Sequence, residues 1–222
     1  MRHIAEVINS IDFTQQEIAD RNQKQVNVEQ WATWFNFRLR PGTCDAAQIE
    51  KLVTECAKFC MSLKSRATPY WLTMLGTSGA GKSFLAKRIF RWHRDSGLFQ
   101  DTTREDHGDF EVTYAREWCW WPKIASMLKS NDGYGIVRDI ETAEFAVIDE
   151  IGAELDKSGH VTNRLANMLS ARVGKWTVIT SNKPMADISR DLDPRISSRM
   201  IRDGSVVVDV DVQDYSLWKH HH

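Results

Sequence analysis

The sequence lacks several features that would assign it to a specialised class of protein. No apolar run approaches the ~20 residues that a membrane-spanning helix needs, so we expect no membrane partner. The first residues, MRHIAEVINSIDF, have no uninterrupted apolar core of the kind found in a signal peptide, which favours a cytoplasmic location. Internal repeats and low-complexity tracts are also absent. These absences are typical of an ordinary globular protein.

Cysteine spacing and net charge argue against two further classes: proteins stabilised by disulfides or a metal, and proteins that attract nucleic acid through an overall basic charge. The four cysteines have no spacing typical of a metal site or a disulfide framework, and we interpret them as reduced, partly buried thiols. The formal net charge is −1, so no overall basic field attracts nucleic acid, and any contact with DNA would come from a local patch. The 42% of hydrophobic residues among 222 is enough for a sizeable core.

The most informative stretch is Gly76–Ser83, which reads GTSGAGKS and fully matches the phosphate-binding pattern GxxxxGK[ST]. An apolar segment at 70–75 predicts a buried strand before it, and 83–92 predicts a helix after it. Its glycines allow backbone N–H groups to converge on phosphate oxygens. The Lys82 ammonium would reach the β- and γ-phosphates, and the Ser83 hydroxyl would bind Mg²⁺. We therefore predict a site for a nucleoside triphosphate. Its predicted binding residues are Gly76, Thr77, Ser78, Gly79, Ala80, Gly81, Lys82, Ser83 and Phe84.

A second motif consists of an apolar strand at 145–148 followed by Asp149 and Glu150. The carboxyl end of a parallel strand is also where a phosphate-binding loop opens. We expect Asp149 to hold Mg²⁺ together with Ser83, and Glu150 to orient or deprotonate the attacking water. This division of roles predicts hydrolysis of the triphosphate.

Two weaker motifs follow. A strand at 176–180 leads into Ser181 and Asn182, whose amide could bind the attacking water or the γ-phosphate. Arg195 and Arg199 are four residues apart on a predicted short helix, so one of them could reach the γ-phosphate held by a neighbouring subunit. By itself, the Ser181-Asn182 pattern is equally compatible with a turn. The Arg195 and Arg199 pattern is equally compatible with a pair of solvated or salt-bridged arginines.

The chain resembles the AAA+ ATPases, and more narrowly the helicase-loader group that includes DnaC, DnaI and IstB. Four segments carry the resemblance through their order and spacing: GTSGAGKS, AVIDEIG, the strand ending in TSN, and RISSRM. The resemblance covers about residues 67–215. It implies an α/β P-loop NTPase with a parallel sheet flanked by helices and no C-terminal lid. It also implies ATP and Mg²⁺ as cofactors, Asn182 as a sensor, and Arg199 as an arginine finger acting in trans in a homo-oligomer, with Arg195 as a second candidate.

The domain organisation that we predict has three parts. Residues 1–66 form a small N-terminal helical extension for partner binding or packing, with helices expected at 4–11, 31–39 and 45–62. Residues 67–218 form the ATPase core, and 219–222 are interpreted as the remnant of a purification tag. Within the core we further expect a polar loop at 100–109, strands at 110–114 and 206–208, and helices at 121–128 and 161–173.

The resemblance implies a Mg²⁺-dependent ATPase that loads a replicative helicase and contacts single-stranded DNA. A transposition-helper ATPase of IstB type fits the core equally well. A P-loop kinase for a small molecule is an alternative from another class, and a nucleotide-gated adaptor with slow hydrolysis is a third. The nine tryptophans could stack on bases, anchor a partner or pack the core, and we expect Trp118 and Trp120 to point to different faces of a helix.

Overall fold

A computed structural model describes residues 26–217, apart from 69, 107–108, 131, 155, 157 and 203. It does not describe the side chains of residues 104–113. The helix expected at 4–11 and the tag remnant expected at 219–222 therefore lie outside the described residues.

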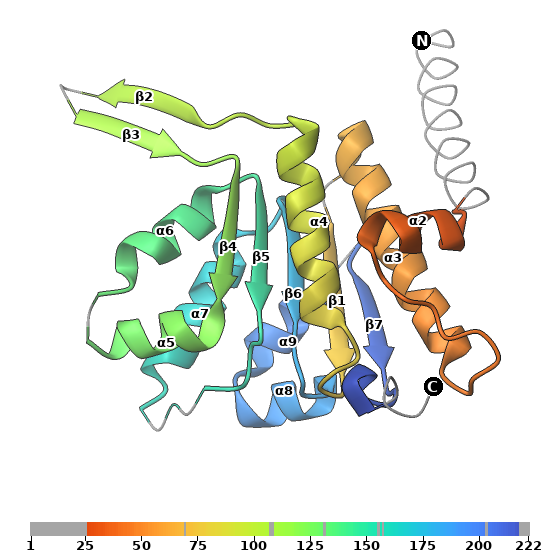
Figure 1. Cartoon of the computed structure of the whole chain (residues 1–222). Helices are drawn as coiled ribbons and strands as arrows, with labels where there is room; N and C mark the ends of the chain where they lie inside the picture. Colours follow the sequence, from red (N-terminus) through yellow and green to blue (C-terminus); the bar gives the residue numbers. More distant parts are fainter. Residues whose placement is uncertain are drawn as a thin grey trace, which may run out of the picture.

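A five-stranded sheet forms the centre of the fold, with the order β4-β5-β6-β1-β7 (Figure 1). Each pair of neighbouring strands is parallel. Its strands are β1 (Trp71–Gly76), β4 (Arg116–Trp120), β5 (Phe145–Asp149), β6 (Trp176–Thr180) and β7 (Val206–Val210). Helices lie on both faces of the sheet, as expected when near-continuous apolar strands alternate with helices. The predicted α/β fold with a parallel sheet flanked by helices is confirmed.

Side chains on the central strands divide between two cores, because successive residues of a strand point to opposite faces of a sheet. Leu72 and Met74 of β1 belong to one hydrophobic cluster. Trp71 and Leu75 of the same strand belong to a second cluster on the other face. All four side chains are almost completely buried. Burial on both faces explains why the segment before the phosphate-binding loop is apolar at nearly every position.

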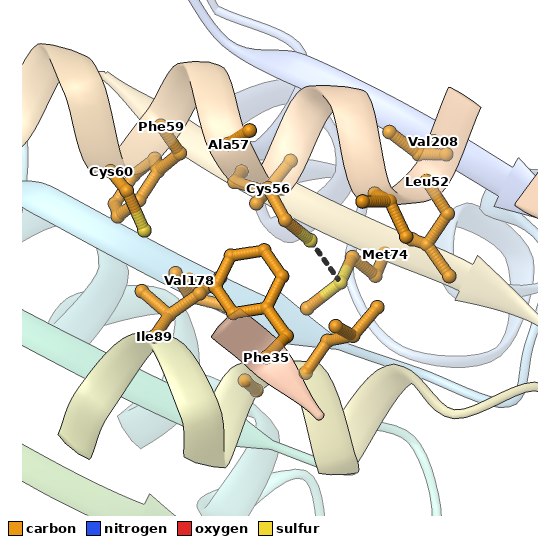
Figure 2. Packing of buried hydrophobic residues seen from close by; sticks show 14 of the residues in the cluster. Phe35, Leu52, Cys56, Ala57, Phe59, Cys60, Met74, Ile89, Val178 and Val208 are labelled. Atoms are coloured by element: carbon orange, nitrogen blue, oxygen red, sulfur yellow. Dashed lines mark hydrogen bonds between the residues drawn. The ribbon is translucent and has the colours of Figure 1, made fainter. Parts of the chain in front are cut away.

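Three helices cover the first face, and Figure 2 shows how closely their side chains pack. They are α2 (Val28–Phe35), α3 (Ala46–Ser65) and α4 (Lys82–Ser96). Phe35 of α2 and Cys56 of α3 are fully or almost fully buried beside Met74 of the sheet. The Cys56 and Met74 sulfur atoms are 3.8 Å apart. Thus α2 and α3 share a core with the central sheet, while a domain boundary near residue 66 stays a prediction.

Five helices contribute to the second face. They are α5 (Trp121–Lys129), α6 (Tyr134–Thr142), α7 (His160–Ala171), α8 (Met185–Asp191) and α9 (Pro194–Met200). Among the described residues, no helix combines the length and the apolar character that crossing a membrane would require.

The segment between α4 and α5 differs from the sequence-based expectation. Residues 100–109 do not form a simple loop, because β2 (Thr102–Asp106) and β3 (Asp109–Thr113) pair as an antiparallel ribbon outside the main sheet. Figure 1 shows this ribbon projecting from the body of the molecule. The predicted strand at 110–114 belongs to the ribbon, and the next strand of the parallel sheet is β4. Trp118 and Trp120 therefore lie on a strand rather than on a helix.

The helix expected at 31–39 lies earlier in the chain, at Val28–Phe35. It ends at Phe35 because Asn36 adopts a left-handed conformation with φ 51°, and its N–H caps the carbonyls of Ala32 and Thr33. Leu39 therefore lies beyond the helix, in the extended stretch that leads to α3. This early end matters for the site, because residues 36–40 then run beside the phosphate-binding loop.

Candidate functional site

A cavity of about 790 Å³ opens at the carboxyl end of β1. Its lining includes residues 78–84 of the phosphate-binding loop and the first turn of α4, together with Glu150 and Asn182. The carboxyl ends of β5 and β6 bring these last two side chains to the loop, although each is separated from it by about 70 to 100 positions in the sequence. The fold therefore brings three of the four sequence motifs to one place.

The loop has the backbone shape that an anion-binding nest requires. Gly76, Gly79 and Gly81 have positive φ values of 122°, 75° and 93°, a region that side-chain-bearing residues rarely adopt. Gly76 also lies against β7, where a Cβ atom would be only 1.9 Å from the Val210 carbonyl oxygen. The helix α4 begins at Lys82, so its free N–H groups and the positive end of its dipole face the loop. This arrangement can hold the phosphates of a nucleotide.

Lys82 links the loop to β6. Its Nζ donates hydrogen bonds to the carbonyl oxygens of Gly76 and Thr77 at 2.8 and 2.7 Å, and to Oδ1 of Asn182 at 2.9 Å. Burial lowers the pKa of the ammonium group, while the nearby Glu150 and Asp149 carboxylates act in the opposite direction. Lys82 is thus a nearly buried cation held at the phosphate site by oxygen atoms that a phosphate group could replace.

Asp149 is held by a residue of the neighbouring strand. The Thr180 hydroxyl donates to Oδ1 of Asp149 at 2.6 Å and accepts a hydrogen bond from the backbone N–H of Glu150 at 2.9 Å. Asp149 is buried, with 3% of its surface exposed. One threonine side chain therefore positions both acidic residues, and we did not predict this role from the sequence.

Glu150 has two unusual features. Its backbone φ is 64°, a left-handed value that strains a residue with a side chain and is often found at functional sites. Its carboxylate accepts a hydrogen bond of 2.9 Å from the indole N–H of Trp120, the last residue of β4. Trp120 pairs with Asp149 across the sheet and is about half exposed. Assigning Trp120 to a helix concealed this contact at the sequence level.

The remaining predicted site residues are placed as follows. Ser83 lines the cavity, and so does Phe84, which is 40% exposed and whose ring centre lies 4.9 Å from the guanidinium carbon of Arg88. Gly76 and Thr77 contact Lys82 through their carbonyls.

Neither of the two arginines of α9 is among the described residues that line this cavity. Arg195 is exposed and donates to the Asp193 carboxylate and to Oδ1 of Asn163. Arg199 donates to the Arg195 carbonyl oxygen at 2.9 Å. The helix itself packs against α7 and α8.

Sequence reasoning also missed part of the cavity wall. Phe37 and Arg38, which follow α2, line the cavity from one side, and Tyr215, which follows β7, lines it too. These positions lie in segments without a recognisable motif, and only the folded chain brings them to the loop.

No family model matches the sequence, and no curated protein matches it either. Solved structures do match the fold. DnaI matches with a TM-score of 0.56 and 18% identity, over 72% of this chain and 85% of that one. The DnaC helicase loader matches with a TM-score of 0.53 and 14% identity, over 78% and 93%. DnaA from Aquifex aeolicus bound to AMPPCP matches with a TM-score of 0.56 and 14% identity, over 84% of this chain and 52% of that one.

At these identities, the comparisons establish the fold alone. The chain has the fold of the AAA+ P-loop NTPases, of the kind found in DnaC and DnaI, as predicted from the sequence motifs. It spans most of the DnaC and DnaI structures but only about half the length of that DnaA chain.

Proposed function

We propose that this chain is an ATP hydrolase of AAA+ type. The observation that carries the proposal is the meeting of Lys82, Asn182 and Glu150 at one cavity beside a P-loop of the required backbone shape. These groups suit the hydrolysis of a triphosphate. The cation would bind the phosphates, the amide would contact the γ-phosphate or the attacking water, and the carboxylate would orient that water.

Each residue has a distinct role in the proposed reaction. The loop N–H groups and Lys82 bind the β- and γ-phosphates, and Asn182 exchanges its contact with Lys82 for one with the γ-phosphate or the attacking water. Glu150 orients that water and accepts its proton. The hydrogen bond from Trp120 keeps the Glu150 carboxylate in place before ATP binds.

The oxygen donors of the site fit Mg²⁺, which usually binds one or two carboxylates together with phosphate oxygens and water. Ser83 and Asp149 would hold the ion. In the described part of the chain, no group of three or more His, Cys, Asp or Glu residues is arranged to hold a metal ion, so the phosphates and water would supply the remaining ligands. When bound, the ion would neutralise negative charge on the phosphates.

Variants of three site residues test this proposal. Lys82→Ala should lose ATP binding, whereas Glu150→Gln should bind ATP and hydrolyse it at least ~100-fold more slowly, because a general base is removed. Trp120→Phe keeps an aromatic ring but removes the indole N–H, and turnover should fall about tenfold with little change in affinity. ATP binding and phosphate release are measured separately. Each is repeated with a chelator of Mg²⁺, and the chelator should stop turnover.

The matched control is Lys87→Ala, which changes another lysine of α4 that lies outside the cavity lining. It should behave like the unaltered protein. Normal turnover by Glu150→Gln would contradict the role of this carboxylate. Formation of ADP without free phosphate would favour the alternative function, a small-molecule kinase.

The biological role that we propose is helicase loading during DNA replication, by a homo-oligomer with ATP at subunit interfaces and with single-stranded DNA as a further ligand. The similarity to the fold of DnaC and DnaI supports this choice. A transposition helper of IstB type remains the second candidate. A binding assay separates these two roles. It compares the Glu150→Gln variant, with and without ATP, for binding to a purified replicative helicase and to a transposase.

A further inference from the structure

Asp45 stands immediately before α3, at the position from which an acidic side chain usually caps a helix. Such a side chain accepts a hydrogen bond from a backbone N–H group of the first turn. The Asp45 side chain makes no hydrogen bond of this kind. It is buried instead, and a buried charge is costly unless other groups pair with it. The carboxylate therefore serves partners outside its own helix.

The partners of Asp45 are Arg40 and the backbone of Gln213. Oδ2 of Asp45 accepts a hydrogen bond of 3.0 Å from the Arg40 guanidinium and one of 3.2 Å from the N–H of Gln213. Arg40 is almost fully buried and donates in turn to the Gln213 carbonyl oxygen at 2.7 Å. The ion pair thus holds both backbone polar groups of Gln213. Hydrogen bonds to charged groups are stronger than neutral ones, so this residue is firmly fixed.

Gln213 belongs to residues 211–217, which we call the C-terminal segment, and this segment runs beside the phosphate-binding loop. The Thr77 hydroxyl donates to the carbonyl oxygen of the residue just before Gln213, at 2.8 Å. The N–H of Tyr215 donates to the Gly79 carbonyl oxygen at 3.0 Å. Both contacts lie within two residues of Gln213. Holding Gln213 therefore also holds the two points at which the segment is bonded to the loop.

The contact with Gly79 bears directly on the shape of the loop. In a trans peptide unit, the carbonyl group and the following N–H point in opposite directions. Holding the Gly79 carbonyl towards the C-terminal segment therefore directs the N–H of Ala80 away from that segment. The segment also packs closely here, since the Asp214 carboxylate leaves no space for a Cβ atom on Gly79. Because phosphate binding depends on converging N–H groups, the segment helps to set the anion-binding shape of the loop.

The start of α3 holds the C-terminal segment at a second point. The Gln48 side chain donates to the Asp211 carbonyl oxygen at 3.1 Å and accepts from the Asp211 N–H at 2.9 Å. Neither Asp45 nor Gln48 is among the described residues that line the cavity. Both therefore reach the phosphate site only through the segment.

We propose that Asp45 is a positioning residue for the phosphate-binding loop, acting through Gln213 and the C-terminal segment. The inference rests on the proposed function, because it concerns how tightly the loop holds the phosphate groups of a triphosphate. Arg40 lines the cavity and can contact a ligand directly, whereas Asp45 acts only through other residues. Because coupling between two sites is reciprocal, a ligand on the loop should in turn stabilise the contacts of Gln213.

Asp45→Asn tests this role, because it removes the charge and keeps the size of the side chain. Calorimetric titration well below the unfolding temperature measures the affinity for two probes, ATP and inorganic tripolyphosphate. Both affinities should fall about tenfold, which is within the usual range of coupling between sites. The direction is informative, since removing a negative charge near an anion site would by itself strengthen anion binding. In hydrolysis assays KM should rise while kcat stays within about twofold, because the loss is one of binding.

Two further variants accompany Asp45→Asn. Glu50→Gln is the matched control, because it removes the same charge from an exposed position of α3 and should bind both probes like the unaltered protein. Gln48→Ala is a milder change that tests the proposal even if Asp45→Asn does not fold. It should weaken both probes about threefold, since neutral hydrogen bonds are weaker than those to charged groups.

Hydrogen exchange adds a readout that a purely structural role would not change. Saturating tripolyphosphate should slow the exchange of the amide groups of residues 211–217 in the unaltered protein. In Asp45→Asn this slowing should be much smaller, because the link between the loop and Gln213 is weakened.

The possible outcomes separate this inference from the proposed function. Unchanged affinity for both probes in folded Asp45→Asn would overturn it, and so would weaker binding of ATP alone. A lower kcat with an unchanged KM would also overturn it, because the effect would then lie in the chemical step. These three results leave the ATPase proposal intact. If the unaltered protein bound neither probe, the proposed function would fail and the inference with it.

Discussion

At the scale of single residues, His93 is a titratable side chain in the buried interior of the fold. A surface or hydrogen-bonded histidine is the ordinary expectation, but this side chain is fully buried. Its ring stacks on Phe99 at 5.2 Å and lies 4.9 Å from the Phe145 ring. Within the described part of the chain, neither ring nitrogen has a hydrogen-bond partner. Burial, with a smaller contribution from Arg116, lowers the pKa of His93 to about 4.

This pKa predicts that stability falls in mild acid. The unfolded chain takes up a proton on His93 near pH 6.5, whereas the folded protein does not until about pH 4. The unfolded state therefore binds more protons between these values, and the stabilisation present above pH 6.5 is lost as the pH falls towards 4. Between pH 7 and pH 5, His93 should account for a loss of about 2 kcal/mol in the free energy of unfolding.

Urea unfolding at the two pH values measures this loss. His93→Phe keeps an aromatic ring without a titrating group, so its free energy of unfolding should fall less between pH 7 and pH 5. Comparing the pH dependence, rather than the absolute stability, removes any effect of repacking. An identical acid-induced loss in both proteins would show that His93 does not titrate in this way.

At the scale of the elements, Arg172 joins α6 and the residues just after it to β6. It follows α7, is fully buried, and donates to the carbonyl oxygens of Ile140, Ala143 and Trp176 and to the Thr177 hydroxyl. Burial lowers its pKa to about 9, which still leaves it charged at neutral pH. The guanidinium group suits this position because its N–H donors point in several fixed directions.

Replacing Arg172 should destabilise the whole sheet. Arg172→Leu would leave several buried carbonyl groups without a donor, at about 1–3 kcal/mol each, so we expect a loss of at least about 3 kcal/mol. Chemical denaturation monitored by circular dichroism measures it. Arg190→Leu is the control, because Arg190 is exposed and should matter little. Equal stability of the two variants would contradict the proposed role of Arg172.

The elements also show which features can be predicted locally. The apolar segment at 145–148 is buried on both faces, and its composition alone predicts a central strand. The segment at 116–120 contains charged and aromatic residues because β4 is the edge strand, half-buried along most of its length. Its side chains resemble those of an amphipathic helix, so the sequence-based assignment was wrong there.

At the scale of the whole molecule, the proposed homo-oligomer would give the arginines of α9 a role. Arg199 and Arg195 do not line the cavity of their own chain, so we propose that they act at the site of a second subunit. We predict that Arg199→Ala abolishes turnover while retaining ATP binding. Mixing it with Lys82→Ala subunits should restore activity, because an intact arginine then meets an intact P-loop at one interface.

Phosphate release across a range of mixing ratios measures this rescue. The control is a Lys82→Ala, Arg199→Ala double variant, which cannot supply the missing guanidinium and should rescue nothing. Absence of rescue at every ratio would contradict action in trans. Arg195→Ala should have a smaller effect, because Arg195 is already bound to Asp193 and Asn163.

The sequence alone determined the P-loop at Gly76–Ser83, the acids at Asp149 and Glu150, and the parallel α/β sheet, because these depend on local backbone shape and on the burial of continuous apolar strands. Only the tertiary structure decided that Trp120 holds Glu150 and that Tyr215 and Phe37 complete the cavity. Contacts between segments so distant in the chain leave no local pattern, since they arise from the order in which the strands join the sheet.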